Sequence, residues 1–188
     1  MKTRRFRADD PERGAWQDAE EILTSIGLSE GMVFVDVGCG EGYFAVPASR
    51  RVGPGGRVCA VDINADAIAR LKEQAEKEGL DNLILDVKEA ENTLFCKGCA
   101  DIVFFAIDLH DFLDPVQVLS NAARMLKPSG RLADLDRKDQ PMDIGPPPEK
   151  RFSVEKARHL IESAGLRIQS VQDAGPYHYL IIAIQDSP

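Results

Sequence analysis

Long apolar runs and a signal segment are both missing from this sequence of 188 residues. No stretch approaches the roughly 18 uninterrupted apolar residues that a membrane-spanning helix requires, so we expect no membrane span. Residues 1–14 carry positive charge without an apolar segment behind them, which argues against a secretory signal and favours a cytoplasmic protein. Because no obvious internal break divides the chain, we expect a single domain over residues 1–188, with residues 1–14 as a flexible arm.

Cysteine and histidine are scarce, with four and three residues respectively. The cysteines are too few and too scattered for a disulfide scaffold in a chain that can build an apolar core, so we expect reduced thiols. Cys96 and Cys99 have the spacing of a metal or redox pair, but a structural zinc site needs about four ligands. Since no second CxxC or HxxxH pair completes the set, we expect no metal and interpret residues 96–99 as a loop that contains two thiols.

An excess of positive charge is also missing, because the net charge is −8 at pH 7. Such a chain repels a phosphate backbone, so we expect no nucleic-acid partner, although the arginines within residues 4–13 could still contact an anion. The apolar fraction of 44% and the charged fraction of 29% are those of an ordinary globular protein.

Strand-like and helix-like segments alternate along the chain. The apolar periodicity predicts helices over residues 15–26, 43–51, 65–78, 114–126 and 154–164. Three polar residues are placed to cap helices at their amino ends, Asn64, Asp114 and Ser153, and Gly79 is placed to end the third helix. Continuous or β-branched apolar runs predict strands over residues 32–37, 57–62, 83–87, 100–106, 131–136, 166–171 and 179–184.

This alternation predicts an α/β fold of the doubly wound, Rossmann-like kind, with a mostly parallel seven-stranded sheet and helices on both faces. The last two strands flank a short turn at Gly175 and Pro176, and a parallel pair would need a far longer crossover. The last strand should therefore run antiparallel to the others. Prolines in residues 138–150 exclude a helix or a central strand, so we expect a surface loop there that covers the acceptor together with residues 177–179.

The strongest chemical signal is the glycine-rich segment VDVGCGEGY at residues 35–43, directly after the first expected strand. Doubly wound sheets bind ligands at this place, where glycines let the backbone approach a ligand closely. Asp62 ends the next strand, where a carboxylate accepts the hydroxyl groups of an adenosine ribose. Two simpler interpretations stay open: the glycines form only a tight turn, and Asp62 only caps the following helix.

These features resemble the class I S-adenosylmethionine-dependent methyltransferases over almost the whole chain from Trp16 onward. VDVGCGEGYFA is similar to the first motif of that family, AVDIN to the second, and MLKPSGRL to the turn between the last central helix and the fifth strand. KEAENTLF is similar to a segment that contacts the adenine, with a glutamate where the family more often has an aspartate. Within the class, the chain most resembles the ubiquinone/menaquinone-biosynthesis-like enzymes of the methyltransferase domain 11/25 type.

The resemblance implies S-adenosylmethionine as cofactor and assigns its binding residues. Asp36 would lie near the methionine end, Asp62 would bind the ribose, and Ile63 would pack on the adenine. Glu89 would accept the adenine amino group, and Ala90 would offer its backbone N–H. The remaining expected contacts come from the first loop and from the end of the fourth strand: Gly38, Cys39, Gly40, Tyr43, Ala106 and Asp108.

The acceptor is not fixed by the resemblance, since the subgroup acts on carbon, oxygen, nitrogen and arsenic. The Asn/Asp-Pro-Pro-Tyr motif of amino-directed members is absent after the fourth strand, and a small acceptor is expected. Methyl transfer from a sulfonium needs few catalytic side chains, because the donor already supplies a good leaving group. His110 is the candidate base, with Asp108 or Asp111 to orient it, and the alternative is an ordinary surface histidine.

Two other functions share parts of this pattern. A nicotinamide-dependent oxidoreductase uses the same turn and ribose carboxylate, but its GxGxxG spacing differs from the GxGxG spacing found here. A non-catalytic cofactor-binding protein would keep the pocket without the activity. The sequence also leaves a homo-oligomer open.

Overall fold

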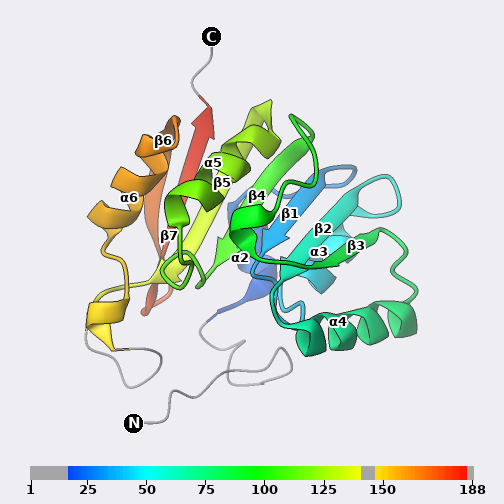
Figure 1. Cartoon of the computed structure of the whole chain (residues 1–188). Helices are drawn as coiled ribbons and strands as arrows, with labels where there is room; N and C mark the ends of the chain where they lie inside the picture. The colour runs from blue at the N-terminus through cyan, green and yellow to red at the C-terminus, as the bar shows by residue number, and fades with distance from the viewer. Residues whose placement is uncertain (1–16, 141–146, 186–188) are drawn as a thin grey trace.

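A single sheet organises the part of the chain that the computed structural model describes, which is residues 17–140 and 147–185. The strand order is β3-β2-β1-β4-β5-β7-β6 (Figure 1). Every pair is parallel except those of β7, which runs antiparallel to both β5 and β6. The predicted doubly wound sheet and its antiparallel last strand are therefore confirmed. The strands are β1 Val33–Val37, β2 Arg57–Asp62, β3 Leu83–Val87, β4 Ala100–Ala106, β5 Leu126–Arg137, β6 Leu166–Ala174 and β7 His178–Gln185.

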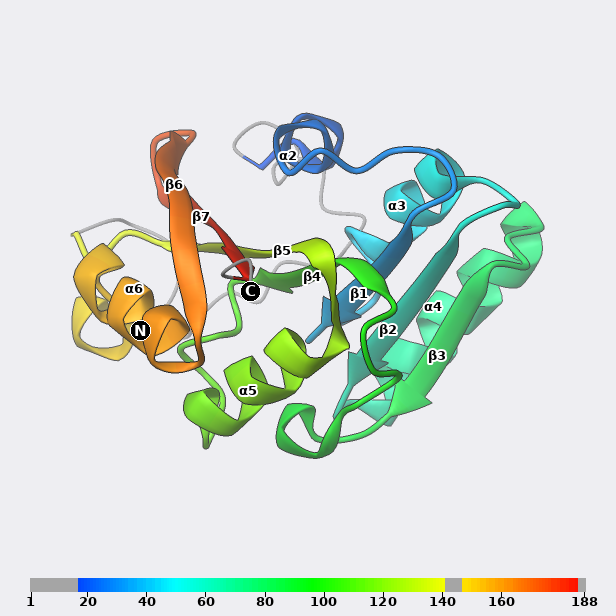
Figure 2. The same ribbon diagram turned by 90° about the horizontal axis from the view of Figure 1, so that it is seen from above.

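Helices cover both faces of this sheet, as Figure 2 shows. One face carries α2 (Ala19–Ser25), α3 (Ala45–Val52) and α4 (Ala65–Glu78). The other carries α5 (Pro115–Met125) and α6 (Val154–Ser163), next to the short 3-10 helix η1 (Ala90–Asn92). β1 contributes Phe34 to the first of these cores and Val35 and Val37 to the second, which explains why its sequence is apolar without interruption.

The predicted helix ends are confirmed where capping residues were expected. The side chain of Asn64 accepts hydrogen bonds from the backbone N–H groups of residues 66 and 67, and Gly79 has the left-handed conformation that ends α4. Asp114 and Ser153 cap α5 and α6 in the same way, each bonding the third backbone N–H that follows it. Each cap satisfies a donor that a helix leaves unpaired.

The expected loop at residues 138–150 is only partly correct. Residues Pro148–Lys150 form a short 3-10 helix, η2, rather than irregular chain. This turn is compatible with its prolines because their fixed φ suits the first position of a helix. Residues 141–146 of the loop and the expected arm at residues 1–14 lie outside the described residues.

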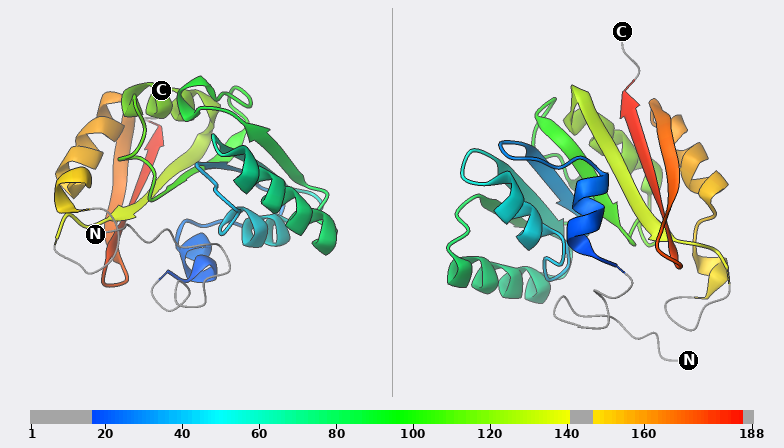
Figure 3. Two further views of the ribbon diagram at one scale, coloured as in Figure 1. Left: turned by 60° about the horizontal axis from the view of Figure 1, so that its bottom comes forward. Right: turned by 180° about the vertical axis from the view of Figure 1, so that it is seen from behind.

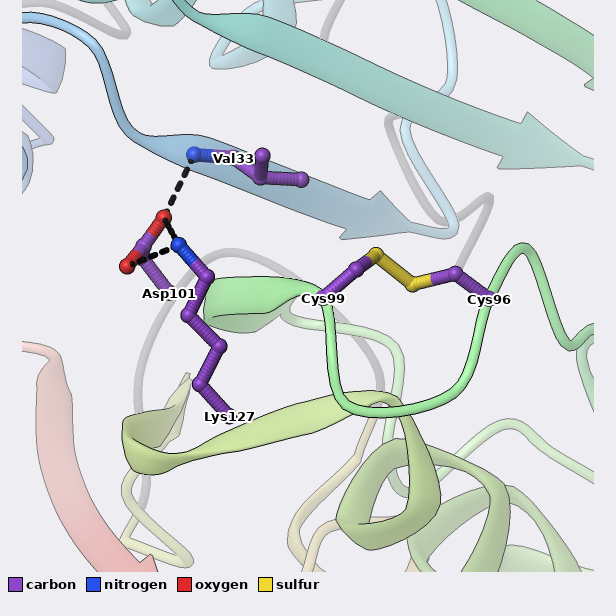
Figure 4. The surroundings of a disulfide bond; sticks show 5 residues. All are labelled: Val33, Cys96, Cys99, Asp101 and Lys127. Atoms are coloured by element: carbon purple, nitrogen blue, oxygen red, sulfur yellow. Dashed lines mark hydrogen bonds and ion pairs between the residues drawn. A yellow bond between two sulfur atoms is a disulfide. The ribbon is translucent and has the colours of Figure 1, made fainter.

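The prediction of reduced thiols is wrong for two of the cysteines. Cys96 and Cys99 form a disulfide, with their Cα atoms 6.0 Å apart (Figure 4). Scattered cysteines do not form a scaffold of bridges between distant segments, but the turn that leads into β4 brings Cys96 and Cys99 together. The neighbouring Asp101 bonds the Lys127 ammonium and the backbone N–H of Val33, each at 2.8 Å, so the disulfide belongs to the amino end of the strands. Cys39 and Cys59 are buried free thiols, as expected.

The central strands of the sheet lie between two ends of the molecule that differ in structure. The views in Figure 3 show α4 and the β6–β7 hairpin at opposite ends of the molecule. Because β1, β2, β4 and β5 run parallel, their carboxyl ends lie at one edge of the sheet. Ligands of doubly wound sheets bind at this edge. Within the described ranges, no helix has the length and apolar character to cross a membrane.

Candidate active site

The glycine-rich loop turns sharply from β1 across the end of β2. The backbone N–H groups of Gly38 and Cys39 both donate to the carbonyl oxygen of Val61, at 2.8 and 3.0 Å. Gly38, Gly40 and Gly42 all have positive φ. A Cβ on Gly42 would lie 2.3 Å from a Leu71 methyl carbon, so a side chain is excluded there by space as well as by conformation. The turn therefore requires its glycines.

Asp62 connects this loop to the second strand. Its Oδ2 accepts the backbone N–H of Gly40 at 2.7 Å, and its Oδ1 accepts that of Asn64 at 2.8 Å. Asn64, not Asp62, is the N-cap of α4, so the capping interpretation of Asp62 is wrong. A carboxylate oxygen can accept more than one hydrogen bond, so both oxygens can still bind the hydroxyl groups of a ligand.

Two further carboxyl groups, those of Asp36 and Asp108, were expected to bind the methyl donor. Asp36 on β1 is 1% exposed. Asp108 lies beyond β4, directly over the loop, because a Cβ on Gly38 would be 2.6 Å from its Oδ2. That oxygen is buried and has no hydrogen-bond partner among the described residues. Burial raises the pKa of Asp108 well above its ordinary value, and the charges of Asp36 and Asp62 raise it further.

The same carboxylates act on the thiol of the loop. Burial raises the pKa of Cys39 well above its usual range, and the charges of Asp36, Asp62 and Asp108 add to the effect. A site with this surplus of negative potential favours a cation and disfavours a pyrophosphate. It therefore suits a sulfonium better than a nicotinamide dinucleotide.

A strained turn joins Ala106 at the end of β4 to Asp108. Ile107 has a φ of +68°, a conformation that is rare for a β-branched residue. Its backbone N–H donates to the carbonyl oxygen of Leu135 at 2.7 Å, so the neighbouring strand β5 holds the turn in place. Strain of this kind concentrates at functional sites. No glycine or asparagine marked this turn in the sequence, which is why pattern analysis missed it.

The other residues expected to bind the methyl donor lie along the same edge of the sheet, in different surroundings. Glu89 is exposed, precedes η1 and accepts a hydrogen bond from Asn92, and Ala90 opens that helix. The backbone N–H of residue 88 bonds the carbonyl oxygen of Asp62, which keeps this segment beside the end of β2. Ile63 is 70% exposed and free to cover a ligand. Tyr43 packs edge-on against Phe44, and its hydroxyl donates to the carbonyl oxygen of residue 17.

His110 is buried rather than a surface histidine. Its side chain is 1% exposed, and its Nδ1 lies 2.8 Å from Oδ2 of Asp136, whose side chain is fully buried. Asp136 therefore orients the ring, in place of the expected Asp108 or Asp111; Asp111 lies 3.7 Å from Nε2. The contact arises because β4 and β5 are parallel neighbours whose carboxyl ends meet, with Ala106 opposite Leu135.

The electrostatics of this pair favour a base. Burial lowers the pKa of His110, but the hydrogen bond to Asp136, its charge and that of Asp111 outweigh burial and the opposing charge of Arg137, so the pKa is raised. In the neutral ring, the Nδ1–H donates to Asp136, which leaves Nε2 to accept a proton. A carboxylate–imidazole pair of this kind can remove a proton from an acceptor.

The residues expected beside a lid are part of the protein interior. His178 and Tyr179 are each 1% exposed, and the Tyr179 hydroxyl donates to the carbonyl oxygen of Phe152 at 3.4 Å. Nη1 of Arg151 donates to the carbonyl oxygens of Lys138 and Gln140, at 3.1 and 2.9 Å, and so fastens the start of the loop after β5. The packing of His178 and Tyr179 therefore excludes these two residues from a lid, whereas Tyr177 is half-buried.

Comparison with known proteins agrees with this geometry. A family model described as a methyltransferase domain matches residues 28–164. A crystal structure of an S-adenosylmethionine-dependent methyltransferase from Aquifex aeolicus superposes with a TM-score of 0.88 at 32% identity, covering 95% of this chain and 98% of that chain. Nocamycin O-methyltransferase of Saccharothrix syringae is 32% identical over 114 residues, which are 61% of this chain and 41% of that protein.

A further relative is the ubiquinone/menaquinone biosynthesis C-methyltransferase UbiE of Pectobacterium carotovorum, 29% identical over 166 residues, which are 86% of this chain. The chain belongs to the methyltransferase domain family, and its resemblance to the S-adenosylmethionine-dependent methyltransferases is confirmed. It spans 41% and 62% of the length of the two curated relatives named here. None of these matches supports the nicotinamide-dependent alternative.

Proposed function

We propose that this protein transfers a methyl group from S-adenosylmethionine to a small-molecule acceptor. The observation that carries the proposal is the group of three carboxyl groups, those of Asp36, Asp62 and Asp108, around the glycine turn. Their negative charge suits a positively charged ligand. The bound donor supplies the methyl group on a positively charged sulfonium, with a neutral thioether as leaving group. The family membership supports the same conclusion.

The residues present fit this donor. The buried Oδ2 of Asp108 has no hydrogen-bond partner among the described residues, so it could accept a hydrogen bond from the donor. Gly38 lets this oxygen lie close to the loop, because a Cβ there would be 2.6 Å from it. Asp62 would bind the ribose hydroxyls, and Ile63 would cover the adenine. Glu89 and the backbone N–H of Ala90 would bind the adenine edge. Asp36, Cys39, Gly40, Tyr43 and Ala106 would complete the walls of the pocket.

His110 would act on the acceptor rather than on the donor. Its Nε2 can remove a proton from a hydroxyl group or from an acidic carbon, while Asp136 keeps the Nδ1–H in place. The relatives named above are described as an O-methyltransferase and a C-methyltransferase, and both reactions begin from an acceptor that is more nucleophilic once deprotonated.

Calorimetry on the purified protein tests the donor assignment. S-adenosylmethionine and S-adenosylhomocysteine should bind, and NAD should not. A screen of phenolic and enolic acceptors with a methyl-labelled donor then tests turnover. Binding of NAD in preference to S-adenosylmethionine would refute the proposal, and donor binding without transfer to any acceptor would favour the non-catalytic alternative.

We further propose that the chain acts as a single domain in the cytoplasm, with the methyl donor and acceptor as its partners and no nucleic acid. The charge of −8 supports the exclusion of nucleic acid. Cell fractionation followed by immunoblotting should find the protein in the cytoplasmic fraction. Recovery of the protein in another fraction would contradict the location. Light scattering after size exclusion tests the open question of a homo-oligomer.

A further inference from the structure

Arg137 is a buried cation that the reaction described so far does not use. It ends β5, and the residue is 6% exposed. Its Nε and Nη1 are buried and have no hydrogen-bond partner among the described residues. Buried guanidinium N–H groups without partners are unfavourable, because the hydration that they lose is not replaced. Its position therefore needs an explanation outside the fold itself.

Arg137 directly follows Asp136, the residue that orients the proposed base. Its charge acts on the pKa of His110, and the charges of Asp136 and Asp111 act on its own pKa in turn. Burial and the nearby Arg151 nevertheless lower the pKa of Arg137 from its ordinary value, so the carboxylates do not fully compensate its charge. The oxygens of Asp136 accept hydrogen bonds from His110 and from the backbone N–H of Arg137, and neither Nε nor Nη1 of the guanidinium bonds to them.

Arg151 cannot supply the missing partner, because it is also a cation. Its Nη1 is held by two backbone carbonyl oxygens, which fixes a second positive charge near the first. In the register between β5 and β7, Arg137 stands opposite His178, so β7 borders the same space. The carboxyl end of β5 thus combines two guanidinium groups with the histidine base.

The surrounding charges restrict what the cation can bind. The carboxyl groups of Asp36, Asp62, Asp111 and Asp136 all act on Asp108 at the neighbouring strand end. These carboxyl groups would repel a doubly charged phosphate more strongly than a singly charged anion. The single negative charge of such an anion can be matched by the Arg137 guanidinium. A carboxylate is the small organic anion with that charge, and its planar oxygens suit arginine.

We propose that Arg137 binds a carboxylate group of the methyl acceptor, so that the acceptor is a small organic acid whose reactive hydroxyl or carbon faces His110. This inference rests on the proposed function and adds the chemical class of the acceptor. Arg137 would be a specificity-determining residue that pairs with the acid, while His110 acts on the reacting group.

The binding test uses the protein saturated with S-adenosylhomocysteine, so that donor binding is established first. Failure of that step would refute the proposed function as a whole. The probes are para-hydroxybenzoate, salicylate and a short aliphatic hydroxy acid, each compared with its neutral amide and with inorganic phosphate. We expect at least one acid to bind about tenfold to a hundredfold more tightly than its amide, as charge-assisted hydrogen bonds allow.

Arg137→Gln should remove the preference for the acid. The matched control is Arg57→Gln, an exposed arginine at the amino end of β2, which should leave the preference unchanged. If no acid binds more tightly than its amide, if the preference survives in Arg137→Gln, or if phosphate binds most tightly, the proposal is overturned while the methyltransferase assignment stands.

A stability measurement gives an independent test without an acceptor. Because Arg137→Gln removes an uncompensated buried charge, we expect its melting temperature without ligand to rise, by about 2–4 °C for a gain near 1 kcal/mol. A fall of similar size would show that Arg137 is held by the fold, and would contradict the assignment of its guanidinium to the acceptor.

Discussion

The two halves of the proposed site, a donor side and an acceptor side, are built from different chemical groups. On the donor side, backbone N–H groups and carboxyl groups surround a glycine turn, and most of them come from the continuous segment between β1 and the start of α4. On the acceptor side, the groups of both signs come from separate segments: His110 follows β4, Asp136 and Arg137 end β5, and Arg151 follows η2. The difference shows that one local turn can bind a ligand that is the same throughout the family. Acceptor recognition depends instead on which strands are neighbours in the sheet.

The largest expected effect separates the halves by activity. His110→Ala should lower turnover by about a hundredfold to ten-thousandfold, the usual contribution of a general base. The affinity for S-adenosylmethionine should stay unchanged, because His110 belongs to the acceptor side. Steady-state kinetics and calorimetry on one preparation measure both quantities. His159→Ala, at an exposed histidine of α6, is the matched control. An equal loss of donor affinity in His110→Ala would mean that the halves are not distinct.

The second effect falls on the donor side. Asp62→Ala should weaken binding of S-adenosylmethionine by roughly tenfold to a hundredfold, since hydrogen bonds to a charged group are lost and Gly40 loses its partner. Asp86→Ala removes an exposed carboxylate from the adjacent strand β3 and serves as the control. Calorimetry compares the two variants with the wild type. Unchanged affinity in Asp62→Ala would remove the ribose contact from the donor half.

A pH profile sharpens the acceptor side. The active form of His110 is neutral, and its pKa is raised, so kcat/KM should rise with pH through a value above that of an ordinary histidine. Asp136→Asn removes the negative charge that raises this pKa, while Asp111 and Arg137 remain, so the rising limb should move to lower pH. A limb that does not move would show that another group titrates. Protonated His110 also stabilises the fold at low pH, and this contribution is lost as pH rises through the folded pKa.

The smallest effect concerns stability. Asp134 on β5 is fully buried, and neither carboxyl oxygen has a partner among the described residues. Burial, followed by the charge of Asp136, raises its pKa well above the ordinary value. A carboxyl group with a raised folded pKa binds its proton more tightly in the folded state, so stability is lost as pH rises from the unfolded pKa toward the folded one.

Asp134→Asn, which stays neutral, should therefore melt a few degrees higher than the wild type at neutral pH, at about 2–4 °C per kcal/mol. The difference should shrink as pH falls toward the unfolded pKa. Thermal melts at several pH values measure this dependence, with Asp86→Asn on the exposed strand as the control. A difference that does not change with pH would contradict the assigned titration.

Most of the fold could be predicted from the sequence because its signals are local. The caps at Asn64, Asp114 and Ser153 and the glycine turn after β1 act within a few residues of themselves, and the structure has them as expected. The short turn between the last strands required an antiparallel pair. Most helix bounds shifted by one or two residues, where fraying makes the local signal weakest. The differences are larger for α2, which begins at Ala19 rather than at residue 15, and for β5, which begins at Leu126 rather than at residue 131.

The acceptor side could be predicted only in part. His110 was identified by its position after β4, but its partner was assigned to nearby carboxylates in the sequence. Asp136 lies 26 residues further along, and nothing in the local pattern connects the two. Nothing in the sequence indicated the burial of Arg137 or the strained turn at Ile107. The Cys96–Cys99 bridge was not predicted, because the small number of cysteines favoured reduced thiols.

By itself, the sequence determined the order of strands and helices, the glycine turn and the carboxylate that supports it, because hydrophobic period, capping and backbone freedom are properties of short segments. The tertiary structure alone decided that His110 meets Asp136 and that Arg137, the residue after Asp136, is buried. These contacts depend on which strands become neighbours and on their register, with Ala106 opposite Leu135, and the free energy that fixes such a register comes from packing over the whole sheet.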